Sequence, residues 1–300
     1  MAKKSKGAAL AEYIALRGAC LMVNAVPYPV ACAAAKGLAW MLVHVFRFKR
    51  ARTLGRIRGC FPEKTEKEAK RIAVASLANV LMTSVEMIRA PRFDTRWIER
   101  HVKDVHVYAE RLKAIADEGK GVVIMVPHSG NWYMAAWAMA RCGVPLFAVA
   151  AKQRNPYINA WLNRQYGEGL EVVERGSVRV MAEIKSRLQK GRCFAILPDL
   201  RVPTKDVQVP FLNGTANVSH GGAGFAVAVG APVVVAIMRR EKGLHTFDHL
   251  ATLRPDPNST DAKAEAIRLT REAMTLINAE VKARPGDWYW YNKRWILQPV

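Results

Sequence analysis

The stretch GVVIMVPHSGNWYMAAW, residues 121–137, decides the fold class because its periodicity changes within a few residues. Residues 121–126 form a continuous apolar run, which is typical of a strand that is buried on both faces of a sheet. A proline, a histidine, a serine and a glycine follow, and the apolar residues then recur with the spacing of a helix. The pattern predicts a buried strand that leads directly into a helix, with His128 between them.

The alternation of apolar runs with helical patterns continues to about residue 237. Further strands are expected at 146–150, 170–173, 193–197 and 233–237, and helices near 156–166, 177–189 and 220–229. Strands that alternate with helices predict an α/β fold with a mostly parallel or mixed central sheet flanked by helices. Outside this region, a capping-box pattern at Thr65 and Glu68 predicts a helix over 66–90, and another long helix is expected near 261–283.

The first 60 residues differ in composition from the rest of the 300-residue chain. They hold eleven Lys and Arg residues and one acid, Glu12, so they carry nearly half of the net charge of +21. The longest uncharged run is interrupted by Pro27 and Pro29, which predicts an apolar helical hairpin rather than one spanning helix. The basic segment 47–58 follows the hairpin directly. We therefore expect residues 1–60 to associate with an anionic membrane surface, and residues 61–300 to form the α/β domain.

Other interpretations of the composition stay open. The apolar helices could be core helices, or the lysines near the N-terminus could begin a signal peptide. A nucleic-acid binder would also carry a large positive charge, but few aromatic residues are interleaved with the basic ones, so no nucleic-acid partner is expected. The five cysteines are scattered and odd in number, which argues against a disulfide framework or a zinc site. We expect no metal; His245 and His249 have a suitable spacing only on a helix, and HTFDH is a strand or loop pattern.

Two polar clusters follow predicted strands, at 128–131 and 198–201. Ligands collect at the carboxyl ends of strands in α/β sheets. His128 is a candidate general base there, and the backbone N–H groups of Ser129, Gly130 and Asn131 are candidate donors to a developing oxyanion. This arrangement favours acyl transfer to a hydroxyl group. The alternatives are a histidine that only caps the helix, or Ser129 as a nucleophile, although no GxSxG elbow surrounds it.

Four segments, in order along the chain, resemble a known family: PHSGNW (127–132), FAILPDLRVPTKDVQVPFLNG (194–214), GFAVAVGAPVVVAIMRR (224–240) and WYWYNKRW (288–295). They are similar to motifs of the bacterial lipid A late acyltransferases and the related phosphatidylinositol mannoside acyltransferases. The resemblance implies transfer of a fatty acyl chain from acyl carrier protein or acyl-CoA to a hydroxyl of a lipid or glycolipid. It also implies that no cofactor is needed besides the acyl thioester. The resemblance further implies that the protein lies on the cytoplasmic face of the inner membrane, attached peripherally or monotopically by the N-terminal hairpin.

The chain departs from the family pattern at one position. The resemblance implies an acidic residue five positions after the histidine, but Tyr133 stands there. A neutral phenol offers a hydrogen bond and no charge, whereas loss of the carboxylate from a comparable triad costs about 10⁴ in rate. Either Asp199 or Tyr133 orients His128, or the protein is a catalytically inactive, lipid-binding relative.

The remaining candidate residues are expected to bind substrate. Phe211, Asn213 and Gly214 are predicted to line the acyl or headgroup pocket. Arg154 and Arg164, on the helix after the second strand, and Arg239, at the end of the last strand, are candidates to meet phosphate groups.

Overall fold

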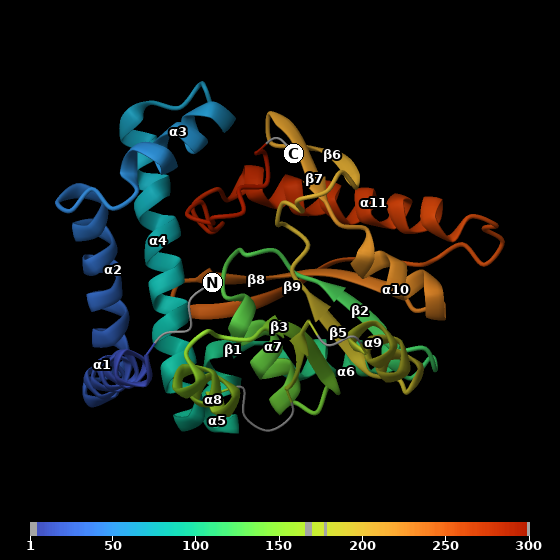
Figure 1. Ribbon diagram of the computed structural model, residues 1–300, viewed down its shortest axis with the longest axis horizontal. Coiled ribbons are helices and arrows are strands. Elements are labelled where there is room, and N and C mark those ends of the chain that lie inside the picture. Colours follow the sequence, from blue (N-terminus) through green and yellow to red (C-terminus); the bar gives the residue numbers. More distant parts are fainter. Residues whose placement is uncertain (1–4, 166–169, 177–178, 299–300) are drawn as a thin grey trace.

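The computed structural model describes residues 5–165, 170–176 and 179–298. They form a mixed seven-stranded sheet with helices around it (Figure 1). In spatial order the strands are β1 (Val102–Lys103), β9 (Leu244–Leu253), β8 (Val233–Glu241), β2 (Val122–Met125), β5 (Cys193–Ile196), β3 (Leu146–Ala151) and β4 (Glu171–Arg175). β8 and β9 are antiparallel, and all other neighbours are parallel. The predicted α/β class is therefore confirmed.

Helices cover both faces of the sheet, which explains why β2 is apolar throughout. Val123 and Met125 belong to the core on the side of α9 (Val180–Gln189), α10 (Gly221–Val229) and α11 (Ala262–Ala283). Val122 and Ile124 belong to the core on the side of α5 (Thr95–His101), α6 (Val105–Ala116) and α7 (Trp132–Arg141). Successive side chains of a strand point to opposite faces, so a strand covered twice needs no polar residue.

Two hairpins were not expected from the sequence. β8 runs to Glu241 and returns as β9 through a two-residue turn, in which Lys242 and Gly243 have φ values of 46° and 86°. Lysine is an unusual residue for such a turn, where Asn-Gly is the common signal. A separate two-stranded sheet consists of β6 (Val207–Phe211) and β7 (Gly214–Val218).

The N-terminal part contains α1 (Lys6–Ala25), α2 (Tyr28–His44) and α3 (Arg50–Cys60). The predicted break at Pro27 is present, but the hairpin is not confirmed: Figure 1 shows α1 end on and α2 from the side, with α2 lying along α4 (Glu66–Arg89). The predicted domain boundary at residue 60 falls between α3 and α4, which pack against each other. α4 begins with the predicted capping box, and the 3₁₀ turn η1 (Ala90–Arg92) follows it.

Two helical segments of the described residues are long and apolar enough to cross a membrane. They are α1 and the segment Glu66–Arg92, which contains α4. Within the most apolar stretch of the α4 segment, 56% of the residues are buried in the protein. Within the corresponding stretch of α1, only 11% are buried. α4 is therefore a core helix of this fold, whereas α1 presents an apolar surface that the described chain does not cover.

Candidate active site

His128 and Asp199 meet at the carboxyl ends of two adjacent strands. β2 and β5 are parallel neighbours with Met125 opposite Ile196, so the residues that follow them emerge side by side. The imidazole Nδ1 of His128 lies 2.8 Å from Asp199 Oδ1, and the His128 backbone N–H donates to Asp199 Oδ2, also at 2.8 Å. The sheet thus brings together two predicted site residues that are 71 positions apart.

Asp199 is buried, and its charge is balanced by donors. The indole Nε1–H of Trp288 donates to Asp199 Oδ2 at 2.8 Å. Burial by itself would raise the pKa of Asp199, but the charge and hydrogen bonds of His128, together with the Trp288 indole, hold that pKa below its ordinary value. An ionised carboxylate only accepts hydrogen bonds, so Nδ1 of His128 carries the shared proton, and in the neutral form of the ring Nε2 is the nitrogen with the lone pair. The imidazole is 17% exposed, which leaves it open to a substrate.

The segment around Trp288 also holds the backbone of residues 127–131, the histidine loop between β2 and α7. The Tyr289 N–H donates to the His128 carbonyl at 2.9 Å, and the Gly130 N–H donates to the Asp287 carbonyl at 3.0 Å. Gly130 has φ of 58°, and a Cβ atom there would lie 1.6 Å from the Met238 carbonyl oxygen, so only glycine fits. Trp288 was not predicted as a partner of Asp199, although the aromatic run at 288–295 was the available signal.

The predicted oxyanion donors are wrong for the three residues named. The N–H groups of Ser129, Gly130 and Asn131 donate to the carbonyls of Pro127, Asp287 and Met238, respectively. The loop bonds at these positions to itself, to the C-terminal segment and to β8, so the donors are already used in the fold. Asn131 is instead the N-cap of α7: its side-chain oxygen accepts the Met134 N–H at 2.9 Å.

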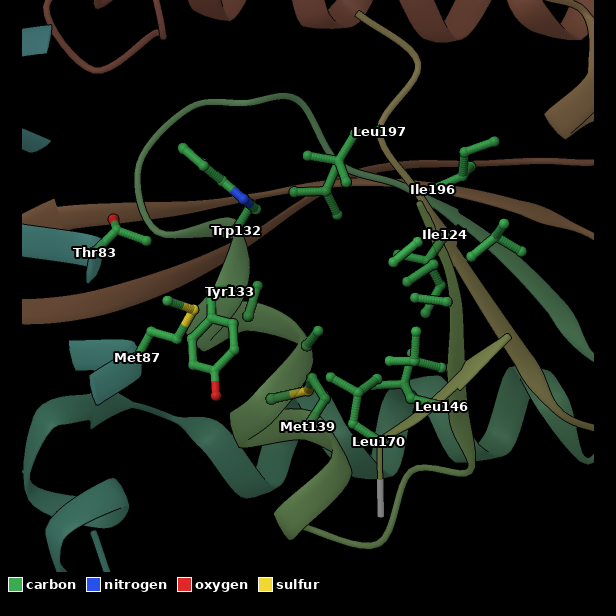
Figure 2. Close-up of a pocket in the computed structure, with 18 of the residues that line it drawn as sticks. Thr83, Met87, Ile124, Trp132, Tyr133, Met139, Leu146, Leu170, Ile196 and Leu197 are labelled. Carbon is green, nitrogen blue, oxygen red and sulfur yellow. The ribbon is translucent and has the colours of Figure 1, made fainter. Parts of the chain in front are cut away.

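Tyr133 does not orient His128. Its hydroxyl donates to the Gln165 carbonyl at 2.7 Å, and its ring lines a cavity on the side of α7 (Figure 2). Its hydroxyl is therefore bonded to α8 (Pro156–Gln165) and not to the imidazole. Of the two predicted partners, only Asp199 contacts the histidine.

An apolar cavity of about 390 Å³ lies beside the histidine loop. Most of its lining comes from α4, α7, β2, β3 and β5, with single residues from α6, β4 and β9, and the labelled residues in Figure 2 are almost all apolar. Trp132 lines the cavity, and its ring centroid lies 5.3 Å from that of His128. Leu197, two residues before Asp199, also lines it. The His128–Asp199 pair therefore sits at an apolar space with the character of a hydrocarbon site.

The residues predicted at the acyl or headgroup pocket lie elsewhere. Phe211 is fully buried in β6, with its ring 5.6 Å from that of Trp288, so it packs behind the site rather than in the cavity. Asn213 and Gly214 are exposed at the β6–β7 turn, where the Asn213 side chain donates to the Gly59 carbonyl. None of the three lines the apolar cavity, because they belong to the separate β6–β7 hairpin, and a substrate-binding role for them stays a prediction.

The predicted phosphate ligands do not gather at His128 either. Arg239 forms ion pairs with Asp248 at 2.8 Å and Glu280 at 2.6 Å, so its charge is already neutralised. Arg164 is exposed on α8, and Arg154 is exposed in the turn before this helix rather than on it. α8 packs against α1, and a phosphate-binding role for these two residues stays a prediction.

A second histidine–carboxylate pair repeats the same geometry. His220 Nδ1 lies 2.5 Å from Asp206 Oδ1, and the His220 N–H donates to Asp206 Oδ2 at 3.3 Å. His220 is the N-cap residue of α10 and does not line the apolar cavity. The pair was not predicted, and it offers a matched control for substitutions at His128.

Comparison with known proteins gives a consistent result along the whole chain. The sequence profile of a family described as bacterial lipid A biosynthesis acyltransferase matches residues 2–296. A phosphatidylinositol mannoside acyltransferase of Mycolicibacterium smegmatis is 26% identical over 255 residues, covering 82% of this chain and 78% of the relative. A lipid A biosynthesis acyltransferase of Haemophilus influenzae is 20% identical over 251 residues, covering 82% and 76%.

Proposed function

Because the chain belongs to the bacterial lipid A biosynthesis acyltransferase family, we propose that it moves a fatty acyl chain from an acyl thioester to a hydroxyl of a lipid or glycolipid. The donor would be acyl carrier protein or CoA carrying the chain. The observation that carries the proposal is the His128–Asp199 pair, 2.8 Å apart beside an apolar cavity. Acid–base chemistry at His128 needs no further cofactor.

His128 is the general base in this proposal. Its Nε2 takes the proton from the acceptor hydroxyl while the hydroxyl oxygen attacks the thioester carbonyl. Asp199 stabilises the imidazolium that forms and fixes the ring in the reactive tautomer. When the tetrahedral intermediate collapses, the carbon–sulfur bond breaks and the imidazolium returns the proton to the leaving thiolate. The products are the ester and the free thiol, and His128 is regenerated.

The apolar cavity would hold the acyl chain of the donor. Its labelled far wall is Met139, Leu146 and Leu170, opposite Trp132 and Leu197 near the histidine loop (Figure 2). If a methylene group needs roughly the 30 Å³ that a water molecule occupies, a cavity of this size takes on the order of ten methylenes. Burial of each methylene contributes about 0.8 kcal/mol, so the chain itself supplies much of the binding free energy.

The N-terminal helices would place this site at the cytoplasmic face of the inner membrane. α1 exposes four large apolar side chains, Leu10, Ile14, Leu21 and Met22. A helix with such a face lies in the plane of a bilayer interface, and the many cations favour anionic lipids. A peripheral or monotopic attachment through α1 and α2 is therefore part of the proposal.

The decisive experiment is acyl transfer with His128→Ala and His220→Ala in parallel. Thiol release from a long-chain acyl thioester is measured with detergent-solubilised lipid acceptors. We expect His128→Ala to lose at least a thousandfold in kcat, while His220→Ala keeps activity within about threefold. Equal activity of wild type and His128→Ala would overturn the enzyme assignment.

The inactive, lipid-binding alternative depended on Tyr133 replacing the family's acid. Asp199 now stands at His128 Nδ1, where the missing carboxylate was needed. This pairing supports the enzyme over the inactive alternative, and the His128→Ala assay distinguishes the two.

A further inference from the structure

A second concave surface, distinct from the apolar cavity, lies between α2, α4 and the β8–β9 turn. It encloses about 740 Å³ and shares no lining residue with the apolar cavity. Its polar lining is dominated by six cations, and we call it the basic groove: Lys36, Lys67, Lys70, Arg71, Arg240 and Lys242. Its floor on α4 includes small and apolar side chains such as Val74, Ala78 and Met82.

Most of the charge in the basic groove is uncompensated. Asp287 is the one acid in its lining, and Arg284 already pairs with it at 2.8 Å. Lys70 pairs with Glu66, and Arg240 with Glu86, on the protein's own side. The other four cations have no ion pair within residues 5–165, 170–176 and 179–298. Like charges gathered in a concave space raise the local potential and attract an anion.

The position of the basic groove indicates where that anion comes from. Trp40 lines the groove on α2, and it is 54% exposed and stacked on His44. The exposed Leu38 and Met41 flank it on the same helix. Tryptophan beside exposed aliphatic residues is typical of the level at which lipid headgroups meet the hydrocarbon, and phosphates lie at that level.

We propose that the basic groove binds the phosphate-bearing headgroup of an anionic membrane lipid. The four unpaired cations hold the phosphate, and the apolar floor accommodates the carbon atoms next to it. Asn79 connects the groove to the histidine loop. It lines the groove, and its side chain donates to the Gly130 carbonyl at 2.6 Å. A lipid held here would fix the height of the His128 loop above the membrane. This site goes beyond the proposed acyl transfer, which does not require it.

Vesicle binding by the full chain tests the proposal. The experiment uses the His128→Ala protein, so it does not depend on turnover, and vesicles of phosphatidylcholine with or without phosphatidylglycerol. Lys36→Glu/Lys67→Glu reverses two charges in the groove. The control, Lys185→Glu/Lys190→Glu, reverses two exposed charges at α9, which lies on the other side of the molecule from α2 (Figure 1). We expect the groove variant to lose about tenfold or more in affinity for the anionic vesicles, and the control less than about threefold.

Three results would overturn the proposal. Equal losses in both double variants would mean that diffuse charge, and not the groove, attracts the membrane. An unchanged affinity in the groove variant would remove the site altogether. Binding of CoA or inorganic phosphate that depends on Lys36 and Lys67 would assign the groove to a soluble phosphate compound. If circular dichroism shows that the groove variant does not fold, Lys36→Gln/Lys67→Gln takes its place. This variant should again lose more affinity for the anionic vesicles than the control.

Discussion

At the residue scale, Asp199 determines what His128 can do. The carboxylate accepts three hydrogen bonds, from the His128 ring, the His128 backbone and the Trp288 indole. A buried charge is tolerated only when it is paired and hydrogen-bonded in this way. The imidazole is therefore held in one orientation before any substrate arrives.

Asp199→Asn tests the charge without changing the shape. The amide cannot stabilise an imidazolium and can stabilise the wrong tautomer, so kcat should fall by about 10³ to 10⁴. KM for the thioester should stay within a few fold, because the apolar cavity is untouched. Steady-state thiol release gives both constants, and an unchanged kcat would remove Asp199 from the mechanism.

Trp288→Phe tests the second donor to Asp199. A hydrogen bond to a charged group is worth about 1.5–3 kcal/mol, so its loss should lower kcat by at least about tenfold. Trp290→Phe is the matched control, because Trp290 is equally buried but donates to the Pro285 carbonyl. A similar kcat in the two variants would mean that Trp288 only fills space.

At the element scale, α7, β3 and β5 form the walls of the apolar cavity, and their side chains set its length. Leu146→Phe places a larger group at the labelled far wall (Figure 2). It should reduce kcat/KM for the longest accepted acyl chain by about tenfold or more relative to a chain shorter by four carbons. The ratio of kcat/KM for the two chain lengths is taken within one variant, so it is insensitive to a general loss of activity. An equal loss of kcat/KM for all chain lengths would place the acyl chain elsewhere.

α1 should act as an interfacial anchor. Ile14→Ser/Leu21→Ser removes two large exposed side chains, each worth about 1.5–3 kcal/mol when buried in hydrocarbon. Vesicle flotation should show a loss of association of at least tenfold, with an unchanged melting temperature. Val107→Ser/Met181→Ser changes two equally exposed residues on α6 and α9, and it should leave association unchanged. Equal flotation by the two variants would contradict the anchor.

At the scale of the whole molecule, the carboxylate of Glu86 joins the N-terminal helices, the sheet and the histidine loop. Glu86, on α4, is fully buried. It accepts hydrogen bonds from Tyr28 at the start of α2 (2.6 Å), from Arg240 on β8 (2.7 Å) and from the Asn131 cap of α7, and it lies 3.1 Å from His245 Nε2 on β9. His245, considered above only as a metal ligand, is therefore part of this network.

The ionisation of Glu86 should make the free energy of unfolding depend on pH in the acid range. Burial alone would raise its pKa, but Arg240 and His245 bring it to about 2, below the ordinary value of 4.5. A lowered pKa means that the ionised form stabilises the native state; this contribution is complete above about pH 4.5 and is lost as the pH falls toward 2.

Glu86→Gln measures that contribution. It should cost about 3 kcal/mol of unfolding free energy at pH 7, and the difference from wild type should shrink below pH 4.5. Urea unfolding across this pH range gives both values. Glu118→Gln, which breaks an exposed pair with Arg254, should cost less than about 1 kcal/mol. A Glu86→Gln penalty that does not change with pH would contradict the assigned pKa.

The sequence by itself determined the α/β class, the strand before His128, the helix behind it and the capping box of α4. Each of these depends on the local period of apolar residues or on residues three positions apart, and that information is present in any short window. The sequence left the partner of His128 open and assigned oxyanion donors that are used for hydrogen bonds within the fold.

Only the tertiary structure decided which carboxylate meets His128. The choice follows from the strand order, which places β5 next to β2 and brings residues 71 positions apart to 2.8 Å. The same is true of Trp288, which reaches Asp199 because the C-terminal segment pairs with the histidine loop at Ser129. Contacts of this kind depend on how distant elements pack, and the hydrophobic pattern of a single segment carries no information about its neighbours.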